Sequence, residues 1–374
     1  MEDVVIVGAG IAGLATSLGL LRLGVSSVVL ESADSLRTSG SALGIWSNGW
    51  RALDAIGVGH ILRAKYNKLS GIVITSVSSG VQTAELPFRD SHTQGGDLEF
   101  RCVNRRVLLE TLANELPIGT IRYSSKVVHI QSEDHAKSIH LSDGTVLETK
   151  VLIGCDGVNS VVSKFLGFST PAYAGRTSVR GFVNFQDGHG LEAKFFQFFG
   201  KGVRFGVIPC DDYAVYWFIT FRPSSLEKEM VEDPAKVKQL VLSKLGKVSD
   251  KIMRVFEETE LENMVCAPLR FRYPWEMLWG NISKDNICVI GDALHPLTPD
   301  IAQGGCSALE DSVILVRLLA RALKRNDEGN EHHAITEALE KFARERRWRC
   351  FDLISTSYIV GYIQQSDGVL LQFF

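Results

Sequence analysis

Residues 4–13 have the sequence VVIVGAGIAG, and this stretch decides the fold of the first part of the chain. Its apolar run predicts a buried parallel strand, its glycines predict a tight turn, and the apolar spacing over residues 14–23 predicts a helix. The free N–H groups and the dipole at such a helix start favour an anionic group, such as a dinucleotide pyrophosphate. We therefore predict a dinucleotide site that uses Gly8, Gly10, Ile11, Ala12 and Gly13.

An acidic residue follows at the position where a dinucleotide ribose is expected. The next apolar strand, residues 25–30, ends at Glu31, about twenty positions after the glycines, where a carboxylate can accept from ribose hydroxyls. The alternative is a glycine-rich turn that serves only packing, but the strand, the helix and the acidic residue together favour a ligand. This segment does not distinguish NAD from FAD.

The composition excludes several classes of partner. The chain has 374 residues, of which 45% are hydrophobic, and its formal net charge is −3. Two sizeable cores are possible, and the slightly acidic balance gives no basic field for nucleic acid. No apolar run is long enough to span a bilayer, so we expect a cytoplasmic protein. The seven cysteines include no CxxC pair, so we expect reduced, mostly buried thiols and no metal site.

The order of strand and helix signals indicates two regions. Alternating strands and helices are followed by a hairpin over residues 71–86, a helix over 103–116 and a β-meander over 121–153. We predict a discontinuous cofactor-binding domain (1–70, 101–170 and 283–374) and a substrate-binding β-sheet domain (71–100 and 171–282). Residues 177–221 are unusually aromatic, so one face of their sheet is expected in a core and the other can form an apolar pocket.

Charged residues at two further places, a helix start and the end of a strand, could bind a ligand. Arg105 and Arg106 lie in the first turn of the helix over 103–116, where a cation opposes the helix dipole. Asp156 follows a buried strand and precedes a helix start at Ser160, which is where open α/β sheets place ligands. The alternatives are exposed arginines and a helix cap without a ligand.

A second motif lies far downstream, where residues 291–311 have the sequence GDALHPLTPDIAQGGCSALED. Gly304 and Gly305 would leave free backbone N–H groups near a helix start, which suits the electron-rich edge of a reduced flavin. Ser307 and Glu310 have the spacing of a capping box at that helix start. A loop of purely structural function seldom combines these residue types.

These three ordered motifs resemble those of the single-component, class A FAD-dependent monooxygenases with the para-hydroxybenzoate hydroxylase fold. The chain is most similar to plant monooxygenases of the salicylate-hydroxylase-like type, and zeaxanthin epoxidase is a more distant relative. The resemblance covers nearly the whole chain. It implies an α/β fold: a Rossmann-like FAD-binding domain, an inserted mixed β-sheet domain and carboxyl-terminal helices. FAD would be the cofactor and NADH or NADPH the co-substrate.

The resemblance also implies roles for the residues of the first motif and of the helix over 103–116. The three glycines, Gly8, Gly10 and Gly13, would contact the FAD pyrophosphate, and Glu31 would contact the adenosine ribose. Arg105 would lie on the flavin side of the cofactor, with its neighbour Arg106 as the alternative register.

The later motifs would surround the rest of the cofactor. Asp156 would take part in binding FAD and NAD(P)H, and Asp292 would contact the ribityl chain or the pyrophosphate. Pro299 would lie beside the isoalloxazine ring, and Gly304 and Gly305 would support its pyrimidine edge.

The implied reaction begins with reduction of FAD by NAD(P)H, and a flavin C4a-hydroperoxide then delivers one oxygen atom of O₂ to the substrate. We expect a small aromatic, phenolic, salicylate-like substrate in a pocket that excludes water. His295, Tyr216 and Arg204 are candidates for activating a phenol, but none is assigned a catalytic role. The alternatives are epoxidation of an apolar isoprenoid alkene and a flavin-binding protein without monooxygenase activity.

Overall fold

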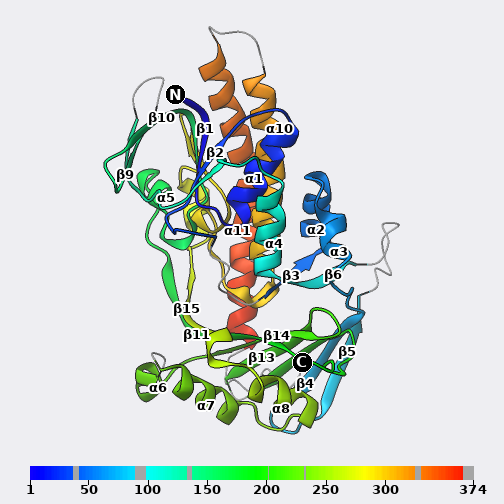
Figure 1. Ribbon diagram of the computed structural model, residues 1–374. Coiled ribbons are helices and arrows are strands. Elements are labelled where there is room, and N and C mark those ends of the chain that lie inside the picture. Colours follow the sequence, from blue (N-terminus) through cyan, green and yellow to red (C-terminus); the bar gives the residue numbers. More distant parts are fainter. Residues whose placement is uncertain are drawn as a thin grey trace.

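The computed structural model describes residues 1–36, 42–88, 98–132, 137–200, 202–230, 233–324 and 330–364. The end of the predicted cofactor-binding domain, residues 365–374, lies outside these described residues. An eight-stranded sheet, a seven-stranded sheet and a small two-stranded sheet form the framework. Figure 1 shows the eight-stranded sheet at one end of the molecule and the seven-stranded sheet at the other, and the long helix of residues 331–364 extends from the first towards the second.

The eight-stranded sheet has a parallel centre. The strands β17, β10, β1, β2 and β7 pair in this order and are all parallel to their neighbours. Their bounds are β1 (Glu2–Val7), β2 (Val28–Leu30), β7 (Ile121–Arg122), β10 (Val146–Gly154) and β17 (Ile287–Val289). The antiparallel strands β8 (Val127–Ser132), β9 (Lys137–Leu141) and β16 (Ser283–Lys284) complete the sheet. The parallel neighbours β1 and β2 are joined by the helix α1 (Ile11–Arg22), because parallel strands need a crossover connection.

Two details differ from the sequence-based expectation. The predicted meander over 121–153 consists only of β8, β9 and β10, because β7 pairs in parallel with β2 instead. The predicted helix over 103–116 begins later, as α4 (Arg105–Asn114), because Asn104 ends the strand β6 (Phe100–Asn104) and caps the helix. Strand β6 pairs with β3 (Ala42–Trp46) in the two-stranded sheet.

The seven-stranded sheet is mixed. Its order is β15-β11-β14-β13-β12-β4-β5, and only the pair β12 and β4 is parallel. The strands are β4 (Gly71–Ser76), β5 (Gln82–Pro87), β11 (Ala172–Asn184), β12 (Phe195–Gly200), β13 (Val203–Pro209), β14 (Ala214–Phe221) and β15 (Met264–Phe271). The early hairpin of β4 and β5 thus joins strands that follow it by more than a hundred residues.

Alternating residues of these strands serve two different faces. On β14, Val215, Trp217 and Ile219 pack in a core with the helices α7 (Pro234–Lys244) and α8 (Asp250–Glu257). Figure 1 shows these helices, with α6 (Ser225–Met230), on the outer side of the sheet. Tyr216 and Phe218 point to the opposite face, because successive side chains of a strand alternate. The predicted division of the aromatic residues between a core and a pocket is confirmed.

Helix α10 (Gly304–Leu323) lies at the centre of the helical layer. It packs against α1 (Ile11–Arg22), α2 (Ser47–Ala55) and α11 (Glu331–Gln364). The shorter helices are α3 (Gly59–Arg63), α5 (Val161–Phe165) and α9 (Trp275–Trp279), and the 3₁₀ turns are η1 (Gly157–Asn159), η2 (Leu261–Asn263), η3 (Gly291–Ala293) and η4 (Pro299–Ile301). The predicted α/β class, with a parallel sheet, a mixed sheet and carboxyl-terminal helices, is confirmed.

The predicted capping box at the start of α10 is wrong. The helix begins at Gly304, so Ser307 and Glu310 lie inside it. Both side chains instead bind Arg346 of α11, with Ser307 Oγ at 3.0 Å and Glu310 Oε2 at 3.1 Å. The spacing of a capping box also fits a pair of residues on one helix face, and here that face contacts a second helix.

The cysteines and the helices bear on two composition-based expectations. All seven cysteines are free thiols, and all but Cys266 are buried. Among the described residues, the helices include none with the length and apolar character that crossing a membrane requires.

Candidate cofactor and substrate site

In the turn between β1 and α1, packing fixes two glycines and leaves the third facing open space. Gly8 has a φ of +103°, and a Cβ there would lie 2.5 Å from the carbonyl oxygen of Cys155. A Cβ on Gly13 would lie 2.0 Å from the Gly8 oxygen. A Cβ on Gly10, the N-cap of α1, would meet no atom within 4 Å. A ligand can therefore approach the helix start at Gly10.

Glu31 lies beside this turn. Its Oε2 accepts a hydrogen bond from the Ala9 N–H at 2.9 Å, and its Oε1 accepts one from the Ala33 N–H at 2.9 Å. The side chain is buried at the end of β2. The acidic residue thus lies close to the first turn of α1, which Ile11 and Ala12 form, and its contact with a ribose stays a prediction.

The structure distinguishes the two arginines at the start of α4. The side chain of Asn104 caps the helix by accepting from the N–H groups of Arg106 and Val107. Arg106 has a side chain that is 64% exposed, and it pairs with Glu110 one turn further along. Arg105 is half-buried. Arg106 is therefore occupied at the surface, and the flavin contact of Arg105 stays a prediction.

Asp156 uses one carboxylate oxygen as a helix cap and leaves the other available. Its Oδ2 accepts from the Val161 N–H at 2.7 Å, at the start of α5. Its Oδ1 is buried and has no hydrogen-bond partner among the described residues. Burial raises the pKa of this carboxyl group. The cap and the ligand interpretations are compatible, because Oδ1 can still accept from a hydroxyl of a cofactor.

A cavity of about 1570 Å³ lies between the second motif and the seven-stranded sheet. Pockets for a single small ligand usually have roughly 300–1,000 Å³, so this one has room for a flavin ring and a second molecule. Its cofactor-side wall contains four of the predicted residues, namely Asp292, Pro299, Gly304 and Gly305. Its sheet-side wall is aromatic and includes Phe195, Phe199, Tyr216 and Phe218.

The cofactor-side wall offers both space and an unused carboxylate. Asp292 is exposed to the cavity and makes no hydrogen bond or ion pair among the described residues. A Cβ on Gly304 would meet no atom within 4 Å, whereas one on Gly305 would lie 2.5 Å from Leu43. Together with the open side of Gly10 and the free Oδ1 of Asp156, this wall fits a dinucleotide that carries a flat ring.

Asp300 holds the loop of the second motif against the sheet. Arg176 of β11 binds both carboxylate oxygens at 2.9 and 2.8 Å, and Arg204 of β13 binds Oδ1 at 3.0 Å and the Asp300 carbonyl at 3.1 Å. All three side chains are buried. Burial alone would raise the pKa of Asp300, but the two guanidinium groups lower it. Burial lowers the pKa of Arg204. The two arginines of the seven-stranded sheet therefore fix the position of this loop through the charge of Asp300.

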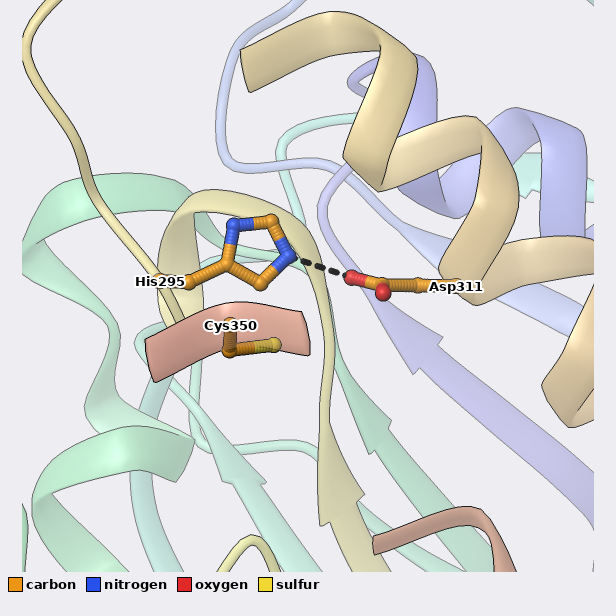
Figure 2. Close-up of side chains that lie close together, drawn as sticks. All are labelled: His295, Asp311 and Cys350. Atoms are coloured by element: carbon orange, nitrogen blue, oxygen red, sulfur yellow. Dashed lines mark hydrogen bonds and ion pairs between the residues drawn. The ribbon is translucent and has the colours of Figure 1, made fainter. Parts of the chain in front are cut away.

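A second buried network fixes the start of this loop, and Figure 2 shows its central part. Asp311 Oδ2 lies 2.6 Å from His295 Nε2 and accepts from the Gly291 N–H at 2.9 Å, while Oδ1 accepts from Arg346 Nε at 2.6 Å. Burial would raise the pKa of Asp311, but the charge of Arg346 and the contact with His295 lower it to about 2. Cys350 completes the group in Figure 2. Because both oxygens of Asp311 are occupied, this group is not arranged to hold a metal.

The structure separates the three candidates for phenol activation. Tyr216 and Arg204 line the cavity, whereas His295 is fully buried behind the loop and does not line it. The sequence analysis missed Arg176, Asp311 and Arg346, as well as the cavity residues Ser178 and Arg180. Strand alternation could have placed Ser178 and Arg180 on one face of their strand, but it does not show which face lines the pocket.

A glycine turn with an acidic partner, and a large cavity between a cofactor loop and an aromatic sheet, define a flavin-dependent oxidoreductase. Residues 1–349 match the family model of the FAD binding domain. Monooxygenase 2 of Arabidopsis thaliana is 50% identical over 100% of this chain and 92% of its own length. Monooxygenase 1 of the same plant is 35% identical over 100% of this chain and 94% of its own length.

The chain therefore belongs to the FAD-binding family of class A monooxygenases. It is an FAD-dependent monooxygenase, and NAD(P)H is the typical co-substrate of this class. The fold is similar to that of HpxO from Klebsiella pneumoniae, solved with FAD and uric acid, with a TM-score of 0.84 and 20% identity over 100% of this chain and 91% of that one. The predicted cofactor, FAD, is confirmed.

The glycine geometry predicts opposite outcomes for two substitutions. Gly10→Val should give a folded protein that retains little FAD, because the side chain would enter only the open space that a pyrophosphate needs. Gly13→Ala should reduce the yield of folded protein, because its Cβ would overlap the Gly8 carbonyl. Circular dichroism and the visible flavin absorbance distinguish these effects. Full flavin content in folded Gly10→Val protein would contradict the pyrophosphate role.

Asp292→Ala should weaken FAD retention without affecting the fold, because the carboxylate has no partner among the described residues to lose. Equilibrium titration of the apoprotein with FAD, followed by flavin fluorescence, measures the change. Asp352→Ala, on the exposed surface of α11, is the matched control and should bind FAD as the wild type does. Equal FAD affinity of the Asp292→Ala and control proteins would exclude a ligand role for Asp292.

The Asp311 network should make a pH-dependent contribution to stability. Asp311→Asn should lower the free energy of unfolding at neutral pH by about 3 kcal/mol, because Arg346 loses its fully buried carboxylate partner and keeps only the partly exposed Glu310. Since the pKa of Asp311 is about 2 in the folded protein, its contribution is complete above about pH 4 and is lost as the pH falls towards 2.

The difference in stability between wild type and variant should therefore shrink over this acid range, as measured by urea unfolding. Glu345→Gln removes an exposed ion pair with Arg317 and should change stability little. A difference for Asp311→Asn that stays constant down to pH 2 would argue against the charge effect.

Proposed function

We propose that this monooxygenase hydroxylates a small aromatic, phenolic substrate, of which salicylate is a simple example. The observation that carries the proposal is the set of rings on the sheet-side wall of the cavity. Phe195, Tyr216 and Phe218 line one face, and neighbouring ring centroids among them are 6.2 Å apart. A flat aromatic molecule can stack on such a wall while it faces the flavin side. Uric acid, the ring compound in the HpxO structure, is of similar size and shape.

When bound, FAD supplies the redox chemistry and the activation of oxygen. The chain would hold the cofactor through the Gly10 helix start, Glu31, Asp156 and Asp292. The aromatic wall would orient the substrate ring and exclude water from the reacting carbon.

Arg204 is placed to assist a phenol. Its guanidinium carbon lies 5.2 Å from the centre of the Phe218 ring, and its buried Nε has no hydrogen-bond partner among the described residues. A nearby positive charge favours the phenolate form, which raises the electron density of the ring. Asp300 keeps Arg204 in position by binding its two terminal nitrogens.

The same residues disfavour an apolar alkene as the substrate. Gln197, Arg180 and Arg204 all line the sheet-side wall. An isoprenoid chain packed against them would displace water without offering acceptors, and unpaired buried polar groups are costly. A polar aromatic molecule satisfies both the rings and these donors.

Anaerobic mixing of the FAD-loaded protein with NADH or NADPH tests the proposal. The visible flavin band should bleach, and one or more phenolic compounds in a panel should accelerate the bleaching and then yield a hydroxylated product on admission of oxygen. The panel should include isoprenoid alkenes. Acceleration and oxygenation confined to the alkenes would reject the phenolic substrate while leaving the monooxygenase class intact.

A further inference from the structure

An exposed aromatic surface covers the outer side of α11 and of the neighbouring helix α9. On α11, Trp348 and Tyr362 are 66% and 58% exposed. On α9, Trp275 and Trp279 are both exposed and lie four positions apart, so they share one face of that helix. Large apolar side chains on the surface of a monomer are usually scattered singly, and a larger group of them marks a site of interaction.

Ring contacts join the two helices into one continuous surface. Trp275 stacks on Tyr273 with ring centroids 4.4 Å apart. Phe271 lies between Tyr273 and Tyr358 of α11, and its ring centroid is 5.1 and 4.9 Å from theirs. We define the α9–α11 patch by its exposed members, which are Trp275, Trp279, Trp348, Tyr358, Ile359 and Tyr362.

The area of the α9–α11 patch is that of one side of a protein–protein interface. Its six residues are between 42% and 78% exposed. At about 200 Å² for each side chain, they present roughly 700 Å² to solvent. Each partner of a standard interface contributes roughly 600–1,000 Å², whereas the largest apolar patch of a typical monomer has roughly 300–600 Å².

The charges along α11 fit a protein partner better than a lipid surface. Residues 350–364 contain no lysine or arginine. Of the arginines before them, Arg344 pairs with Glu340 at 3.6 Å. Arg349 pairs with Glu310 at 3.4 Å. Helices that lie on membranes usually present cations to the lipid headgroups, whereas a protein interface has a centre poor in charge.

The spacing of residues along α11 makes the patch complementary to itself. Five residues of this helix recur at alternating intervals of three and four, which is the spacing of a seam between paired helices: Trp348, Phe351, Ser355, Tyr358 and Tyr362. Rings stand at both ends of the seam, and the small Ser355 stands at its middle. An antiparallel second copy, related by a two-fold axis at Ser355, would place its Tyr362 beside Trp348 and its Ser355 beside Ser355.

We propose that the α9–α11 patch pairs two copies of this chain around a two-fold axis at Ser355. The inner side of the same part of α11 carries Val360 and Gln364, which line the cavity. Pairing would therefore support, from outside, a helix that forms part of the cavity wall. The inference goes beyond the proposed function and does not depend on which substrate is bound.

Sedimentation equilibrium of the FAD-loaded full chain tests the pairing. The wild type should be a dimer with a Kd of about 1 µM or lower, as expected for an interface of standard size. Ile359→Glu should raise this Kd at least about 100-fold, because a two-fold interface buries the new charge twice. Leu226→Glu, on the exposed face of α6, is the matched control and should leave the Kd unchanged. Flavin content and circular dichroism confirm that each variant is folded.

Cysteine substitutions test the position of the axis. Ser355→Cys would bring two thiols together at the axis, and oxidation by dissolved oxygen with a copper catalyst should join the two copies through a disulfide. Thr356→Cys is the matched control, because Thr356 is exposed on the same helix but lies about 100° further around it. Electrophoresis without reductant should show cross-linking at least about tenfold slower for Thr356→Cys, because its thiols would point away from each other.

Three results would overturn the inference. The first is a monomeric wild type at about 100 µM, whether the patch then contacts lipid, another protein or the chain's own residues 365–374. The second is a dimer that Ile359→Glu leaves as tight as the Leu226→Glu control, because another surface would then join the copies. The third is cross-linking of Thr356→Cys that is as fast as that of Ser355→Cys, because the axis would then not lie at Ser355.

Discussion

The ion pairs of Asp300 with Arg176 and Arg204 join the two halves of this molecule. Asp300 belongs to the loop before α10, whereas the arginines belong to the seven-stranded sheet, 124 and 96 positions away in the chain. Because these side chains are buried, loss of one partner would leave an uncompensated charge, which typically costs about 3–5 kcal/mol. Gly361 of α11 packs so closely that a Cβ there would lie 2.3 Å from Asp300 Oδ2. The position of the cavity between loop and sheet depends on this cluster.

The same loop is fixed at its other end by Asp311. This carboxylate holds the Gly291 amide and is itself held by Arg346, so α10 and α11 together set the direction in which the chain leaves β17. Between the two buried carboxylates, Asp292 and Pro299 face the cavity. A loop anchored at both ends can present such groups in one position without support from a ligand.

Alternation of side chains along the strands gives the two faces of the seven-stranded sheet different roles. One face of the strands β11 to β14 forms a core with α7 and α8, and the other face remains available to a substrate. Phe205, Trp217 and Phe221 stabilise the fold on the helix-covered side. Phe218 and Arg180 on the cavity side are free to determine what binds, because the fold does not depend on them in the same way.

The sequence by itself determined the glycine turn, the acidic residue after the second strand and the order of the motifs. The first two depend on neighbours within about thirty residues, where periodicity and helix-start chemistry act directly, and the order of the motifs is read along the chain itself. Local spacing also gave one wrong prediction, the capping box at the start of α10. Ser307 and Glu310 have the pattern of a helix cap but bind Arg346 of α11. Only the tertiary structure decided that Asp300 meets two arginines, that Asp311 meets Arg346, and that Ser178 and Arg180 share the cavity with Asp292. These contacts follow from strand register and helix packing across the chain, which local preferences do not specify.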